Sequence, residues 1–135
     1  MGNAALAEIL GYDEMHRTPV EIVAHGLPYD AVERLASTLG LSMEKLCQII
    51  PVSRRTLARY RGGDLDAHLS DHLLMIGRVY ERAVEVLESP EYALLWLKAP
   101  NYAFRSHTPL DYLSSFAGAQ EVLDELGRLQ HGVFV

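Results

Sequence analysis

The stretch Ser53–Arg61, SRRTLARYR, is the densest cluster of positive charge in the chain. It holds four of the twelve basic residues in nine positions, although the 135-residue protein has a formal net charge of −6. On a helix with about 100° per residue, Leu57 and Tyr60 share one side while Arg55 and Arg59 project from the other. Arginine suits DNA, because its planar fork can bind a phosphate, or the O6 and N7 of guanine, with two hydrogen bonds.

The sequence around this stretch has the layout of a helix-turn-helix. Ser42 is placed to cap a short helix that ends at Pro51, and Ser53 to cap a second that runs to Gly62–Gly63. Such a pair, whose second helix opens on polar and basic residues, can place that helix in the DNA major groove. Residues 45–63 include five basic and no acidic side chains, so the local field is positive. The predicted DNA-binding residues are Ser53, Arg54, Arg55, Thr56, Arg59 and Arg61.

A second interpretation of this face stays open. Arginine-rich helix faces are often only solvated surfaces, and short helix pairs are common in all-α proteins. Thr56 in particular is either a contact to phosphate or to a thymine methyl, or an ordinary helix-surface threonine.

Residue types that support other chemistry do not form a convergent set. His68 and His72 stand four residues apart on one predicted helix, but no third ligand and no His-Glu-x-x-His motif accompany them, so we interpret them as helix-surface histidines. Cys47 lies in an apolar helical pattern with Lys45 as its nearest base, a poor setting for a nucleophile. The sequence therefore predicts no enzyme, no metal site and no cofactor.

Composition restricts the cellular setting. With 49% apolar residues, a chain of 135 residues can bury a real core in one domain or in two small ones. Its single cysteine cannot form an internal disulfide, which fits a reducing compartment. No apolar run approaches the ~20 residues of a membrane span, and no secretory signal is evident. We therefore expect a cytoplasmic protein without a membrane partner.

Capping and stop signals divide the chain into short helices, and no alternating apolar–polar run indicates a strand. The predicted fold class is therefore all-α. The expected helices are residues 18–26, 27–40, 42–51, 53–62, 66–88, 89–98 and 116–130, with a further start signal at Thr108–Pro109. Trp96, with Tyr92 and Leu95 beside it, is interpreted as core. Because no flexible linker is evident, we expect the two halves to pack together.

The order of the motifs resembles a known family. Gly26-Leu27-Pro28, Leu39–Ser42 and Val52–Tyr60 are similar to an Xre-type helix-turn-helix. The motifs of the second half are more specific. They are Leu69-Ser70-Asp71, Trp96-Leu97, Pro100-Asn101, Thr108–Leu113, Gly118-Ala119 and Leu126–Phe134. Together they look like the Xre/MbcA/ParS antitoxin family, whose members pair with RES-domain toxins.

The resemblance implies a two-part antitoxin. Residues 1–65 would form an Xre-like helix-turn-helix bundle that binds operator DNA and represses its own operon. That bundle would pack on a helical domain, residues 66–135, that dimerises and blocks the active site of an NAD-degrading RES-domain toxin. Family members also associate through their own chains, so a homodimer is expected. The implied toxin-binding residues are Arg105, Gly127, Arg128, Gln130, His131, Gly132, Val133, Phe134 and Val135.

The chain departs from the family pattern at two places, and one alternative function stays open. Residues 104–107, FRSH, replace a turn that is commonly Gly-rich, and Gln130 stands where Glu is most often found. Judged on residue types alone, Val133 and Phe134 either bind a partner or fold back onto their own core. The alternative function is a stand-alone helix-turn-helix regulator whose C-terminal half dimerises or senses a ligand.

Overall fold

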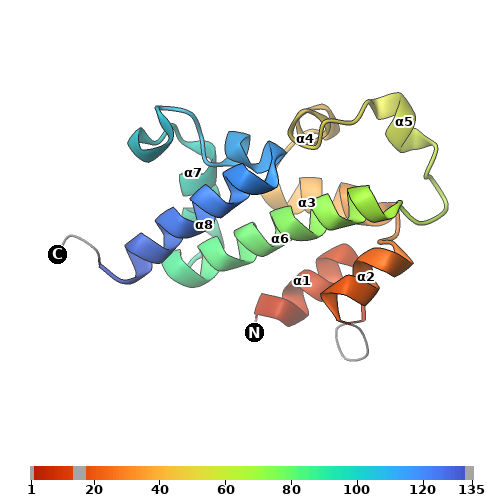
Figure 1. Cartoon of the computed structure of the whole chain (residues 1–135), viewed down its shortest axis with the longest axis horizontal. Helices are drawn as coiled ribbons and strands as arrows, with labels where there is room; N and C mark the ends of the chain where they lie inside the picture. The colour runs from red at the N-terminus through yellow and green to blue at the C-terminus, as the bar shows by residue number, and fades with distance from the viewer. Residues whose placement is uncertain (1, 14–17, 133–135) are drawn as a thin grey trace. The chain divides into compact units, whose positions relative to one another are not determined.

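The computed structural model describes residues 2–13 and 18–132, and in these ranges the chain is helical (Figure 1). Apart from one isolated β-bridge between Pro28 and Asp64, every regular element in the described ranges is an α-helix or a short 3₁₀ helix. The predicted all-α class is confirmed. No helix in this part of the protein combines the length and the apolar content that crossing a bilayer would need.

The helices fall into two compact units, Met1–Gly77 and Arg78–Val135. The first contains α1 (Gly2–Leu10), α2 (Pro19–His25), α3 (Asp30–Leu39), α4 (Met43–Ile49), α5 (Arg54–Ala58) and the first half of α6 (Ala67–Leu87). The second contains the rest of α6, α7 (Pro90–Lys98), η1 (Tyr102–Phe104), η2 (Leu110–Ser114) and α8 (Phe116–Gln130). The division predicted at residue 66 falls at the start of α6, whereas the two units divide within that helix.

Local capping explains why most helices begin where the sequence indicates. Thr18 and Glu21 form a reciprocal capping box at α2, in which the Thr18 Oγ1 accepts from the Glu21 N–H at 3.2 Å. Serine hydroxyls cap α4, α5, α7 and α8 in the same way, each accepting the N–H three residues on. The predicted bounds of α8 are confirmed.

Two local predictions were wrong, and one helix was missed. Pro28 does not open a helix, because it bridges to Asp64 and α3 begins only at Asp30. The helix capped by Ser53 is shorter than expected, since α5 ends at Ala58 and hydrogen-bonded turns follow. Helix α1 was not predicted at all, although its Leu6 and Leu10 are buried in the core of unit 1.

Burial corrects two further interpretations. His72 is only 3% exposed, so it belongs to the interior and not to the helix surface, whereas His68 is exposed. Neither belongs to a group of three His, Cys, Asp or Glu side chains able to hold a metal within the described ranges. In unit 2, Trp96 is half-buried, but its neighbours Tyr92 and Leu95 are largely exposed and do not contribute to the core.

Candidate functional sites

The first candidate site is the helix pair α4–α5. The Ser53 Oγ accepts from the Thr56 N–H at 3.0 Å, and the Ser53 hydroxyl donates to Thr56 Oγ1, also at 3.0 Å. These bonds occupy the Ser53 hydroxyl and one acceptor position of Thr56, which is half-buried. Both residues therefore have a structural role in starting α5, in addition to the DNA contact predicted for them.

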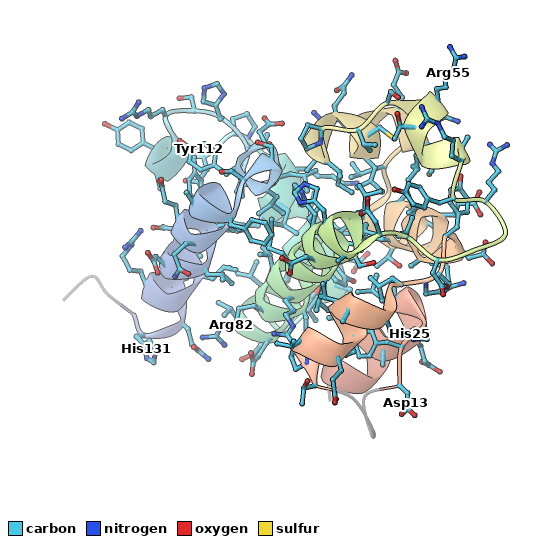
Figure 2. The ribbon with its side chains drawn as sticks, turned by 45° about the vertical axis from the view of Figure 1, so that its right-hand side comes forward. Asp13, His25, Arg55, Arg82, Tyr112 and His131 are labelled. Atoms are coloured by element: carbon cyan, nitrogen blue, oxygen red, sulfur yellow. The ribbon has the colours of Figure 1, made fainter. Side chains whose placement is uncertain are left out.

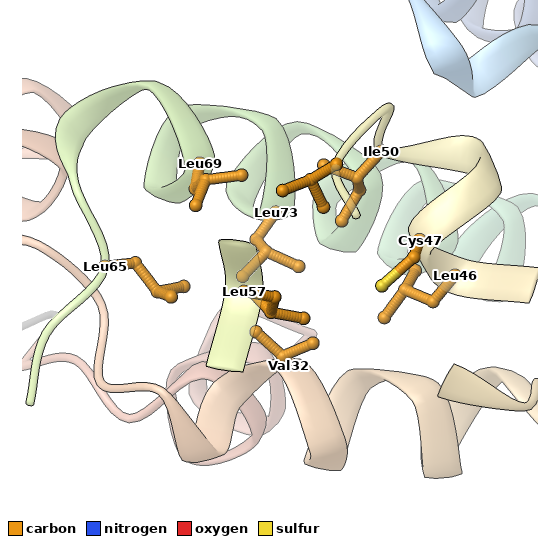
Figure 3. A pocket seen from close by; sticks show the side chains of 9 residues that line it. Val32, Leu46, Cys47, Ile50, Leu57, Leu65, Leu69 and Leu73 are labelled. Carbon is orange, nitrogen blue, oxygen red and sulfur yellow. The ribbon is translucent and has the colours of Figure 1, made fainter. Parts of the chain in front are cut away.

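Helix α5 has only five residues, too few to be stable alone, and it depends on packing. Its buried Leu57 lies between Val32 of α3 and the α6 leucines Leu69 and Leu73 (Figure 3). These side chains, with others from α4 and from the segments that flank α4 and α6, line an apolar cavity of about 10 Å³, roughly the size of a single water. The buried thiol of Cys47 lines the same cavity, and desolvation raises its pKa.

The α5 region also carries three arginines that face solvent. Arg54, Arg55 and Arg59 are exposed, and none of them makes an ion pair or a side-chain hydrogen bond within the described part of the chain. Figure 2 shows Arg55 pointing away from the ribbon. Three uncompensated guanidinium groups around one short helix form a positive surface suited to an anionic polymer.

Arg61 differs from these three. It lies in the turns after α5, and a side-chain hydrogen bond with Tyr29 raises its pKa above the usual value, with the charge of Glu33 acting in the same direction. Arg61 is exposed, so it remains accessible to a phosphate. Its guanidinium nevertheless interacts with residues near the start of α3, unlike those of Arg54, Arg55 and Arg59.

The sequence did not single out Tyr60 and Asp66 as a pair that positions α5. The Tyr60 hydroxyl donates to Asp66 Oδ2 at 2.8 Å, and Asp66 Oδ1 accepts from the Leu69 N–H, also at 2.8 Å. The backbone hydrogen bond from Leu69 is the largest cause of a lowered pKa at Asp66. One carboxylate therefore caps α6 and holds the turn that follows α5. The Asp66-x-x-Leu69 spacing of a helix cap was the only signal for it in the sequence.

The second candidate site is the end of α8. Arg128 is exposed and pairs with Glu125, with its Nε 2.8 Å from Glu125 Oε1. Gln130 accepts a hydrogen bond from Arg82 of α6, and Arg82 also pairs with Glu85 at 2.7 Å. The amide of Gln130 thus provides an acceptor where a glutamate is common in the family.

His131 and Gly132 complete the described part of this segment. His131 is the exposed C-cap of α8, and Gly132 has a positive φ of 62°. Figure 2 labels Arg82 and His131. The predicted residues Val133, Phe134 and Val135 lie outside the described residues. The structure thus brings Gly127, Arg128, Gln130 and His131 together at one helix end.

Gly118 and Gly127 of α8 differ in whether packing requires a glycine at the position. A Cβ on Gly118 would lie 2.0 Å from the carbonyl oxygen of Tyr112, so the packing of the unit requires glycine there. A Cβ on Gly127 would meet no atom within 4 Å. Glycine in a helix interior costs about 1 kcal/mol relative to alanine. Nothing in the described part of the chain explains that cost at Gly127, and the residue is accessible to a partner.

Arg105 lies apart from that helix end in sequence, in the turn between α7 and η2. Arg105 and Ser106 both have positive φ values, 55° and 69°, in the region that glycine favours. Asn101 holds the turn: its Oδ1 accepts from the Ala103 N–H at 2.9 Å, and its carbonyl accepts from the Ser106 N–H at 3.0 Å. The turn thus has a backbone conformation typical of a Gly-rich sequence, although larger residues form it. Arg105 is exposed on this turn.

The comparisons with protein families match both halves of the chain. Residues 18–78 match the Antitoxin Xre-like helix-turn-helix domain, and residues 82–132 match the Antitoxin Xre/MbcA/ParS C-terminal toxin-binding domain. The matches therefore change over close to the boundary between units 1 and 2. Arg54, Arg55 and Arg59 lie in the first matched domain, and the end of α8 lies in the second.

Similarity to individual proteins extends over most of the chain. Antitoxin Xre of Yersinia enterocolitica is 25% identical over 118 residues, which cover 85% of this chain and 80% of that protein. Antitoxin Xre of Photorhabdus laumondii is 25% identical over 115 residues, which cover 83% of this chain and 78% of that protein. A chain of the crystal structure of the M. tuberculosis MbcT–MbcA toxin–antitoxin complex superposes with a TM-score of 0.57 at 25% identity, covering 79% of this chain and 96% of that one.

Proposed function

We propose, from the premise that this chain belongs to the Xre/MbcA/ParS antitoxin family and carries its helix-turn-helix domain, that it neutralises a RES-domain toxin that degrades NAD. The chain binds that toxin through its C-terminal domain and blocks the active site. As a homodimer, it also binds operator DNA and represses its own operon. The protein acts in the cytoplasm as an inhibitor and a repressor, and needs no cofactor.

The observation that carries the toxin half is the match of residues 82–132 to a toxin-binding domain, together with the exposed end of α8. Arg128 and His131 present hydrogen-bond donors there, next to Gly127, where no packing contact requires a glycine. The solved neighbour is a chain of a toxin–antitoxin complex, which supports the same mode of action.

Co-expression tests this half. Growth and cellular NAD should collapse when a partner RES-domain toxin is induced alone, and both should recover when the full chain is co-expressed. Deletion of residues 130–135 should abolish the recovery. Full recovery with the truncated chain would remove the tail from the mechanism.

The DNA half is supported by the three outward arginines of α5 and by the helix-turn-helix match over residues 18–78. Gel-shift titration of the chain with the promoter region of its own operon tests it. A homodimer predicts protection of an inverted repeat, because two weak contacts linked in one particle bind more tightly than either alone. Protection of a single half-site would contradict the dimer. A stand-alone regulator would require that no toxin gene lies nearby.

A further inference from the structure

Three large apolar side chains of unit 2 project into solvent close to one another in sequence. Tyr92 and Leu95 of α7 are 64% and 66% exposed, and Tyr102 of η1 is 97% exposed. We call these three residues the α7–η1 surface. Within the described part of unit 1, Val20 is the only large apolar side chain of comparable exposure, at 78%. The exposure is therefore concentrated in one unit.

The geometry of α7 shows that this exposure is directional. Tyr92 and Leu95 are three residues apart and lie within about 60° of each other around the helix. Ala93 and Leu97, on the other side, are fully buried in the core of unit 2. Helix α7 is thus apolar on both sides although only one side packs within its own unit, and the other is available to a partner.

The scaffold beneath the α7–η1 surface is braced. The Ser89 Oγ caps α7 by accepting from the Tyr92 N–H at 3.2 Å, and Pro90 occupies the first turn. The buried Phe104 makes edge contacts with Trp96 of α7, at 6.2 Å between ring centroids, and with Tyr112 of η2, at 4.9 Å. These contacts link the turn that carries Tyr102 to α7. A surface that is already ordered loses little entropy on binding.

The same turn holds the strained backbone of Arg105 and Ser106. Non-glycine residues in this region persist only where the surrounding contacts hold them, and such strain often lies at binding sites. Tyr102 and Arg105 are three residues apart and both exposed. An exposed tyrosine beside an exposed arginine is a pair of residue types enriched in binding hot spots.

We propose that the α7–η1 surface docks the toxin, as a second contact distinct from the tail of the chain, with Arg105 at its edge. The inference rests on the proposed function, because it takes a RES-domain toxin as the occupant. All of its residues lie within residues 82–132, the segment that matches the toxin-binding domain. The tail blocks the active site, and the α7–η1 surface supplies apolar contact area.

The test uses the full chain and a purified RES-domain toxin, with affinity measured by calorimetry. Leu95→Ser combined with Tyr102→Ser should raise the Kd at least tenfold. Val20→Ser, an equally exposed apolar residue in unit 1, should leave the Kd unchanged. Thermal unfolding followed by circular dichroism should show the same Tm for all three proteins, since none of these side chains is buried. A tail-deleted chain should keep weak binding that the double variant abolishes.

The possible outcomes distinguish the proposed function from the proposal that the α7–η1 surface docks the toxin. If the unmodified chain does not bind the RES-domain protein, the proposed function fails. If the unmodified chain binds and the double variant binds equally well, only the α7–η1 surface is overturned. The double variant could also bind toxin normally but be a monomer in light scattering where the unmodified chain is a homodimer. In that case the occupant is a second copy of this chain, and the toxin assignment is again overturned.

Discussion

The surface around α5 in unit 1 and the α7–η1 surface in unit 2 differ in the chemistry that they expose. The first is a short helix with three exposed arginines over one buried leucine, and the second is two exposed tyrosines and a leucine on a braced scaffold. Phosphates are bound through charge, which salt weakens, whereas apolar contact responds little to salt. Different responses to salt and to side-chain truncation should therefore distinguish the two regions.

The largest effect on stability should come from removing the buried side chain through which α5 packs. Leu57→Ala deletes a buried side chain beside an existing cavity, and should destabilise unit 1 by about 3 kcal/mol. Chemical denaturation monitored by circular dichroism measures this loss. Operator binding should fall with it, while toxin binding at low temperature is retained. Equal loss of both activities would show that the two regions do not act independently.

Removing charge should affect DNA binding alone. Arg55→Ala with Arg59→Ala should weaken operator binding and reduce the slope of log K against log salt by up to about 0.9 for each phosphate that the variant no longer binds. Gel-shift titrations between low and physiological salt measure the slope. Arg78→Ala, an exposed arginine outside α5, is the control and should change neither value. An unchanged slope in the double variant would exclude this face.

The cap of α6 should make unit 1 sensitive to acid. The pKa of Asp66 is lowered in the folded state, so its stabilising effect is present above the unfolded value of about 4 and is lost as the pH falls through the folded pKa. Asp66→Ala should cost about 1 kcal/mol at neutral pH. Asp66→Asn keeps a capping oxygen and should reduce the acid dependence more than the stability at neutral pH. Urea unfolding at neutral and acidic pH compares the three proteins.

The smallest effect should come from relieving the strained turn. Ser106→Gly removes the side chain from a residue with a φ of 69° and should stabilise unit 2 by about 1 kcal/mol, seen as a higher Tm. Arg105→Gly should give a similar gain but weaken toxin binding. If both variants bind toxin as the unmodified chain does, Arg105 contributes nothing at the interface.

Much of the fold could be predicted because its signals are local. Thr18, Ser42, Ser53 and Ser89 each cap a helix through a hydrogen bond to a residue three positions on, and sequence spacing alone reveals such bonds. The short length of α5 could not be predicted from sequence spacing. Its cap is local, but its end depends on turns that Tyr60 and Asp66 hold.

The candidate sites were predicted unevenly for a related reason. The arginines of residues 53–61 are visible in the sequence, and their exposure follows from the amphipathic pattern. Tyr92 and Leu95 were expected in the core, because apolar side chains at helical spacing usually pack. On that helix, Ala93 and Leu97 are the fully buried side chains.

The sequence by itself determined most of the helix starts, the positive cluster and the family, because these depend on residue types at short spacings and on the order of motifs. The tertiary structure decided which side chains remain in solvent, because exposure depends on elements that lie far apart in the sequence. It buried His72, tied Arg61 to Tyr29, and left the α7–η1 surface uncovered within the described part of the chain.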